Sequence, residues 1–204
     1  MYKSNTLRIF PLILVVIVII ALITGMITVG RYLFADKEEP VDEGLVTAKD
    51  ELLTLNVSRS VRMTIRGPIV ADEEFTSERI EVSPISRQYK TYSGYIDSIE
   101  KSKSYDNSMK AYEEFVYALD KAAMTKSAKV DSTESEDVRG ICATGKIYEF
   151  EIVNAGEPVK RYWTSTCKGS PGTFGASVEQ VTNLFTDQIP EKDRPSFHTN
   201  SLRF

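Results

Sequence analysis

Residues 139–168, RGICATGKIYEFEIVNAGEPVKRYWTSTCK, are the stretch of sequence that decides the fold. Two runs of alternating apolar and polar residues flank the link NAGE at 154–157, which predicts two half-buried strands joined as a β-hairpin. With residues 154–155 as the loop, Cys142 lies opposite Cys167 and Tyr148 opposite Arg161. The same register puts one set of side chains on one face of the hairpin: Cys142, Tyr148, Phe150, Ile152, Val159, Trp163 and Cys167.

Cys142 and Cys167 are the two cysteines of the chain. Because opposed Cβ atoms of an antiparallel pair lie about 4.5–5.5 Å apart, a disulfide can join them after a small adjustment. We predict this disulfide, which implies an oxidising compartment. A pair of reduced, buried cysteines is the alternative, whereas the wide spacing argues against a redox-active pair.

Residues 9–30 contain no charged residue, although the 204-residue chain has 25 Lys and Arg and 29 Asp and Glu. As a helix rising about 1.5 Å per residue, this run is long enough to cross a bilayer, and it is longer than the apolar region of a cleaved signal peptide. Lys3 and Arg8 precede it, and the acidic run DKEEPVDE follows it at 36–43. This charge bias favours a cytoplasmic N-terminus.

These features predict a single-pass protein of the cell membrane with five regions. Residues 1–8 are a cytoplasmic N-terminus, 9–30 an uncleaved transmembrane signal anchor and 31–45 an acidic tether. An extracytoplasmic α+β domain follows at 46–190, and 191–204 form a flexible tail.

The periodicity of residues 46–190 predicts the elements of that domain. Alternation predicts strands at 61–66, 78–82 and 88–95, ahead of the hairpin. Apolar residues three and four apart predict a helix from 109 to 123, capped by Asp106 or Asn107, and one from 178 to 189, capped by Ser177. A short stretch at 46–55 is also compatible with a helix. The order β-β-β-α-β-β-α predicts an antiparallel sheet of about five strands with two helices on one face.

The sequence carries no motif of a known catalytic site. His198 is the one histidine, which excludes histidine-cluster zinc sites and argues against a Ser-His-Asp triad. No GxSxG, Walker-type or GxGxxG motif occurs. A pI near 5.2 argues against a basic nucleic-acid-binding protein. We therefore expect a non-enzymatic protein with no catalytic residue, cofactor, metal site or nucleic-acid partner.

Charged residues on the predicted strands give weaker signals. Glu149 and Glu151 share the outward face of one strand, but glycosidase carboxylates flank a cleft, so we interpret this pair as a solvated strand face. A basic strip on the exposed sheet face is a candidate site for anionic glycopolymers or lipid headgroups: Arg62, Arg66 and Arg79. Pairing of these arginines with Glu78 or Glu81 across strands is the simpler alternative.

Three other groups have a simpler structural interpretation. The turn at 172–175 can bind an anion before a helix, but it more simply reverses the chain. The acidic residues of the 127–138 loop lack the spacing of a calcium-binding loop. Five tyrosines can line a sugar-binding surface, although a core role is simpler: Tyr89, Tyr92, Tyr95, Tyr112 and Tyr148.

Four segments occur together in this chain: SVRMTIRGPIVADEEF at 60–75, KAYEEFVYALDKAAM at 110–124, RGICATGKIYEFEI at 139–152 and YWTSTCKGSPGTFGAS at 162–177. In this combination the chain resembles uncharacterised single-pass membrane-anchored proteins of Saccharibacteria and related small-genome bacteria. The resemblance covers most of residues 55–190. It implies location and architecture only, and it assigns no catalytic or binding residue.

These observations favour a binding or structural module at the cell envelope, with residues 9–30 in the lipid bilayer. An envelope protein or polymer is the expected partner, bound through the sheet face or the 125–140 loop. An envelope hydrolase with a non-standard site is one alternative. A pilin-like filament subunit is another, although the chain lacks the Gly-aromatic processing site and the early helix Glu of pilins.

Overall fold

The computed structural model describes residues 47–128 and 137–195. The chain divides into two units, Met1–Leu45 and Val46–Phe204, and the described residues all belong to the second. No helix among them is long and apolar enough to cross a membrane. The predicted anchor at 9–30, the tether at 31–45 and residues 196–204 of the predicted tail lie outside the described residues.

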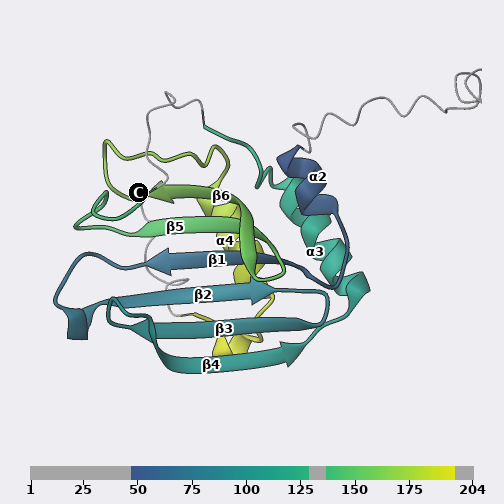
Figure 1. The fold of residues 1–204 in the computed structure, drawn as a ribbon, viewed down its shortest axis with the longest axis horizontal. Coiled ribbons are helices and arrows are strands. Elements are labelled where there is room, and N and C mark those ends of the chain that lie inside the picture. The colour runs from purple at the N-terminus through teal and green to yellow at the C-terminus, as the bar shows by residue number, and fades with distance from the viewer. Residues whose placement is uncertain (1–46, 129–136, 196–204) are drawn as a thin grey trace, which may run out of the picture. The chain divides into compact units, whose positions relative to one another are not determined.

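Six strands of the described chain form one antiparallel sheet in the order β4-β3-β2-β1-β5-β6 (Figure 1). Their bounds are β1 (Arg59–Arg66), β2 (Thr76–Val82), β3 (Ser86–Ser93), β4 (Ser98–Asp106), β5 (Ile147–Asn154) and β6 (Glu157–Ser165). Strands β1 to β4 follow one another as a meander. Because β1 also pairs with β5, the later hairpin extends the same sheet on its other side.

Three α-helices accompany the sheet in the described chain: α2 (Ala48–Leu53), α3 (Met109–Lys121) and α4 (Val178–Asp187). In Figure 1, α4 lies behind the sheet, and α2 packs against α3. The predicted cap of α4 is confirmed, since Ser177 Oγ accepts a hydrogen bond from the Gln180 N–H. Helix α3 is instead capped by Ser108, one residue beyond the predicted Asn107.

The main core lies between one face of the sheet and the apolar sides of the helices. Alternate residues of the strands point into it, among them Val61, Met63 and Ile65 of β1 and Tyr148, Phe150 and Ile152 of β5. Its largest buried members include Met63, Ile80, Tyr112, Leu119, Phe150, Ile152 and Phe185. The predicted α+β architecture with helices on one face of an antiparallel sheet is therefore confirmed.

Strand β4 is the element that the sequence did not predict, and it raises the sheet from about five strands to six. Its residues SIEKSKSYD lack apolar alternation, and all except Tyr105 are exposed. An edge strand with little burial leaves no hydrophobic period, and exposed lysines on such a strand also resist edge-to-edge association. The strand forms because the chain turns back tightly at 94–97 and pairs with β3.

The predicted register of the β5–β6 hairpin is wrong. Ala155 and Gly156 both have positive φ, 51° and 90°, so they occupy the turn and Asn154 pairs with Glu157. A bulge after Ile152 shifts the strands further, and Glu149 faces Trp163. Therefore Tyr148 and Phe150 enter the main core, whereas Trp163 points to the other face of the sheet.

The predicted disulfide is confirmed: the Cα atoms of Cys142 and Cys167 lie 5.5 Å apart. The bridge lies outside the β5–β6 ladder, because Cys142 precedes β5 and Cys167 follows β6. Around it a second, smaller cluster forms on the face away from the main core: Val138, Ile141, Cys142, Ile147, Trp163 and Cys167. The disulfide thus joins the segment before the hairpin to the segment after it.

Candidate functional site

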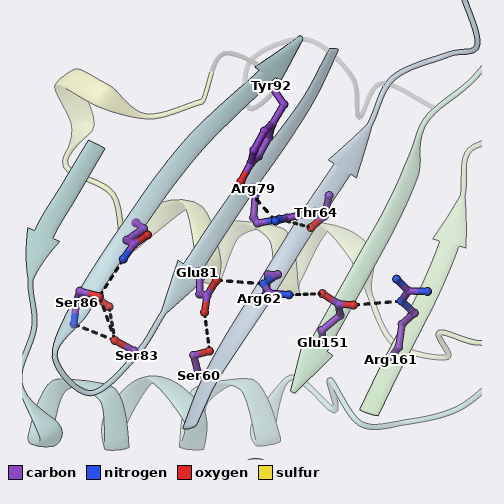
Figure 2. Close-up of polar contacts among 11 residues, drawn as sticks. Ser60, Arg62, Thr64, Arg79, Glu81, Ser83, Ser86, Tyr92, Glu151 and Arg161 are labelled. Carbon is purple, nitrogen blue, oxygen red and sulfur yellow. Dashed lines mark hydrogen bonds and ion pairs between the residues drawn. The ribbon is translucent and has the colours of Figure 1, made fainter. Parts of the chain in front are cut away.

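The face of the sheet opposite α4 carries a layer of charged side chains, several of which Figure 2 shows. These are the residues that alternate with the core positions of the strands, so the sheet register brings them together. Arg62 of β1, for example, lies between Glu81 of β2 and Glu151 of β5. We call this group the polar layer: Arg62, Thr64, Arg66, Arg79, Glu81, Glu149, Glu151 and Arg161.

Arg62 at the centre of the polar layer is paired on both sides. Its Nε lies 3.1 Å from Glu81 Oε2, and its Nη1 lies 3.4 Å from Glu151 Oε2. The other Glu81 oxygen accepts a hydrogen bond of 2.8 Å from Ser60 Oγ. The positive charge of Arg62 is therefore compensated within the layer.

Arg161 on β6 connects the two carboxylates of β5. Its Nε lies 3.1 Å from Glu151 Oε1, and its Nη2 lies 3.2 Å from Glu149 Oε2. Arg66 Nη1 approaches Glu149 more loosely, at 3.9 Å from Oε1. The two carboxylates of β5 are thus held between arginines of β1 and β6.

Arg79 differs from these arginines because its hydrogen-bond partners are neutral. Its Nε donates to Thr64 Oγ1 at 3.3 Å, and its Nη1 donates to the Tyr92 hydroxyl at 3.4 Å. The guanidinium carbon lies 5.1 Å from the centroid of the Tyr92 ring. Among the described residues, Arg79 takes part in no ion pair.

A cavity of about 260 Å³ opens over this part of the polar layer. We call it the arginine pocket, and its charged lining residues are Arg62, Arg66, Arg79, Asp97, Glu149, Glu151 and Arg161. Four guanidinium groups face three carboxyl groups, so the lining carries a net positive charge when all of them are ionised. The acidic composition of the whole chain therefore does not describe the charge of this pocket.

Burial of Glu149 changes its acid–base properties. Only 4% of the residue is exposed, and this burial raises the pKa of its carboxyl group above the ordinary value for Glu. Arg161 and Arg66 oppose the shift by favouring the ionised form. The interpretation of Glu149 and Glu151 as a solvated strand face is therefore wrong: arginine side chains from the neighbouring strands cover both.

The prediction of a basic strip is partly confirmed. Arg62, Arg66 and Arg79 do lie on one face of the sheet, and the predicted pairing of Arg62 with Glu81 is confirmed. Pairing with Glu78 is wrong, since that carboxyl points to the other face and accepts a hydrogen bond of 2.8 Å from the Tyr89 hydroxyl.

Two charged residues of the pocket, Asp97 and Arg161, were not predicted as site residues. Arg161 is the more informative case. The predicted register placed it opposite Tyr148, whereas the bulged hairpin places it opposite Glu151. The sequence offered one signal for this pairing: Arg161 lies on one predicted strand of the hairpin, and Glu149 and Glu151 lie on the other.

The other predicted candidates are structural or lie outside the described residues. In the 172–175 turn, the Phe174 N–H donates to the Trp163 carbonyl and the Gly175 N–H to the Lys126 carbonyl, so the turn reverses the chain. Tyr89, Tyr112 and Tyr148 are buried in the main core, whereas Tyr92 lies against Arg79, outside the main core, and Tyr95 is exposed, so the predicted core role is wrong for these two. His198 and the acidic residues at 131–136 are not described, and the described chain holds no cluster of three or more residues suited to a metal ion.

No protein family and no curated protein matches this chain. What the site can do therefore rests on its own chemistry. Guanidinium N–H groups beside a cavity donate charge-assisted hydrogen bonds to carboxylate, phosphate or sulfate groups. The arginine pocket is suited to bind an anion.

Proposed function

We propose that this chain is a non-enzymatic binding module of the cell envelope, anchored by a single span at residues 9–30. Its extracytoplasmic domain recognises an anionic group on an envelope protein or polymer through the arginine pocket. The observation that carries this proposal is Arg79, which lines the pocket and has only neutral hydrogen-bond partners among the described residues.

The surroundings of Arg79 favour binding of an incoming anion. Its guanidinium is already oriented by Thr64 and by the ring of Tyr92, so little side-chain entropy is lost when a ligand binds. Arg66 is a second donor, because its contact with Glu149 is the longest ion pair of the layer. An anion between the two arginines would be contacted from β1 and β2.

A hydrolase is the second candidate, and one observation favours it. Glu149 combines a raised pKa with a place in a cavity, as general acids often do. Against it, Glu149 and Glu151 are on the same strand, and both bind Arg161, so they do not face each other across a substrate. If the protein hydrolyses envelope glycans and Glu149→Gln abolishes this activity, the hydrolase is favoured.

Calorimetric titration of the full-length protein with poly-glutamate and with polyphosphate tests the proposal. Hydrogen bonds to charged groups contribute about 1.5–3 kcal/mol, so Arg79→Gln should weaken binding of the preferred polymer by about 10-fold or more. Arg139→Gln is the matched control, because this substitution removes the same charge at a site outside the pocket. The Arg139 side chain is 81% exposed and pairs with Asp137. Equal binding by wild type and Arg79→Gln would contradict the proposal.

The location of the domain has its own test. Protease treatment of intact cells should degrade residues 47–195 while leaving the N-terminal segment inside. Detergent permeabilisation gives the control for proteins on the inner side. Protection of the domain in intact cells, with digestion only after permeabilisation, would show that it does not face outward.

A further inference from the structure

A second surface lies beside the arginine pocket, along the outer edge of β6. A cavity of about 520 Å³ follows this strand, and among its lining residues are Ser127, Val159, Lys160, Arg161, Trp163 and Thr173. We call it the β6 groove. We infer that the β6 groove binds an extended acidic segment of a partner protein, which adds to the sheet as a further strand.

The backbone of β6 offers free hydrogen-bonding groups to such a segment. β6 is the last strand of the sheet, and its first five residues are exposed. The Trp163 N–H and C=O point away from β5, because they bond Thr173 Oγ1 at 3.2 Å and the Phe174 N–H at 2.9 Å. Backbone groups alternate in direction along a strand, so those of Arg161 point the same way. Within the described chain, nothing pairs with them.

The chain itself already extends the sheet beyond Trp163. Phe174 forms a bridge with Ser127, and the Ala128 N–H donates to the Thr173 carbonyl at 2.8 Å. This short ladder covers the Trp163 end of β6 and ends before Arg161. An added strand would therefore lie in line with residues 173–174, with the ladder as a wall at one end of the groove.

Charge selects the kind of strand that fits. Lys160 and Arg161 flank the free edge, and 43% of the Arg161 side chain is exposed. Opposite charges on neighbouring strands attract. The groove thus favours acidic side chains next to Lys160, which takes part in no ion pair among the described residues. Val159, which is 40% exposed, offers an apolar contact to a residue between the acidic side chains. This surface goes beyond the arginine pocket, since its main contacts are to the backbone.

A synthetic peptide of alternating Glu and Val tests the inference against the isotope-labelled full-length protein. We expect saturable shifts of the Arg161 and Val159 amide signals. Methyl groups on the peptide nitrogens that face β6 should weaken binding by about 10-fold or more, since each removes a hydrogen bond. The same methyl groups on the intervening nitrogens, which point away from β6, are the matched control and should have little effect.

Other results would overturn the inference. They are equal binding of both methylated peptides, equal binding of a Lys and Val peptide, or no shift at Arg161. Self-association that grows with protein concentration and protects the Arg161 amide from exchange would also overturn it, because a second copy would then occupy the edge. Arg139→Gln serves as the protein control and should bind the peptide as the wild type does.

Discussion

Arg79 shows how one side chain in a compensated layer can remain available for a ligand. Arg62 and Arg161 each contact two carboxylates, whereas Arg79 contacts a threonine and a tyrosine hydroxyl. The difference follows from register, since Thr64 is the β1 residue opposite Arg79 and Glu81 is opposite Arg62. Sequence alternation predicted that the arginines share a face, but only the register assigns their partners.

Gly172 is required by two separate constraints. Its φ is +76°, and a Cβ there would lie 2.8 Å from Thr164 Cα and closer still to the Trp163 carbonyl oxygen. Gly140 has the same φ of +76° with no atom within 4 Å of its Cβ position. Gly140→Ala should therefore cost about 1–2 kcal/mol of unfolding free energy, from conformation alone. Gly172→Ala should cost clearly more in denaturant titrations, and equal losses would contradict the steric contribution.

If the arginine pocket binds an anion as proposed, Glu149 should make that binding depend on pH. Its raised pKa means that the native state holds this proton more tightly than the unfolded state does. The stability it contributes is present below the unfolded pKa of Glu and is lost as pH rises through the native pKa. The charged groups around it are Arg66, Arg79, Glu151 and Arg161. Protonation leaves the arginines less compensated, so anions should bind more tightly as pH falls through that pKa.

Sulfate is a suitable ligand for this measurement, because its charge is constant in that range. Its affinity for the full-length wild type should rise as the pH is lowered toward the native pKa of Glu149. Glu149→Gln should bind sulfate more tightly at neutral pH and with a weaker pH dependence. The idea fails if both proteins give the same pH profile.

The β5–β6 hairpin was predictable as an element but not in detail. Alternation identified both strands, and the disulfide was predicted correctly from the two cysteines, although it lies outside the β5–β6 ladder and the register used to predict it is wrong. The turn and the bulge depend on the backbone at Ala155 and Gly156, and alternation has no information about these φ values. One consequence is that Arg161 was assigned to Tyr148, so the pocket itself could not be predicted.

The disulfide holds the smaller cluster on the sheet. Because it closes the hairpin loop in the unfolded chain, replacing Cys142 and Cys167 by Ser should lower the unfolding free energy by about 3 kcal/mol. Reductant should destabilise the wild type by a similar amount and leave the double variant unchanged. Denaturant titration with and without reductant measures both. A wild type insensitive to full reduction would contradict this role.

At the scale of the molecule, the two faces of one sheet carry different kinds of side chain. Apolar residues of one parity pack on α3 and α4, and charged residues of the other parity form the polar layer. Helix-covered architecture follows from periodicity, so it could be predicted. The burial of Glu149 and Glu151 could not be predicted, because it depends on the aliphatic parts of arginine side chains from strands far apart in the sequence.

The most direct test of the account follows the side-chain Nε–H signals of the arginines by NMR while sulfate is added to the full-length protein. We predict a saturable shift of the Arg79 signal, with smaller shifts at Arg66 and no change in the amides of α3 and α4. Arg139, outside the pocket, gives the internal control. An Arg79 signal that does not move, or moves without saturating as Arg139 does, would contradict an anion site in the arginine pocket.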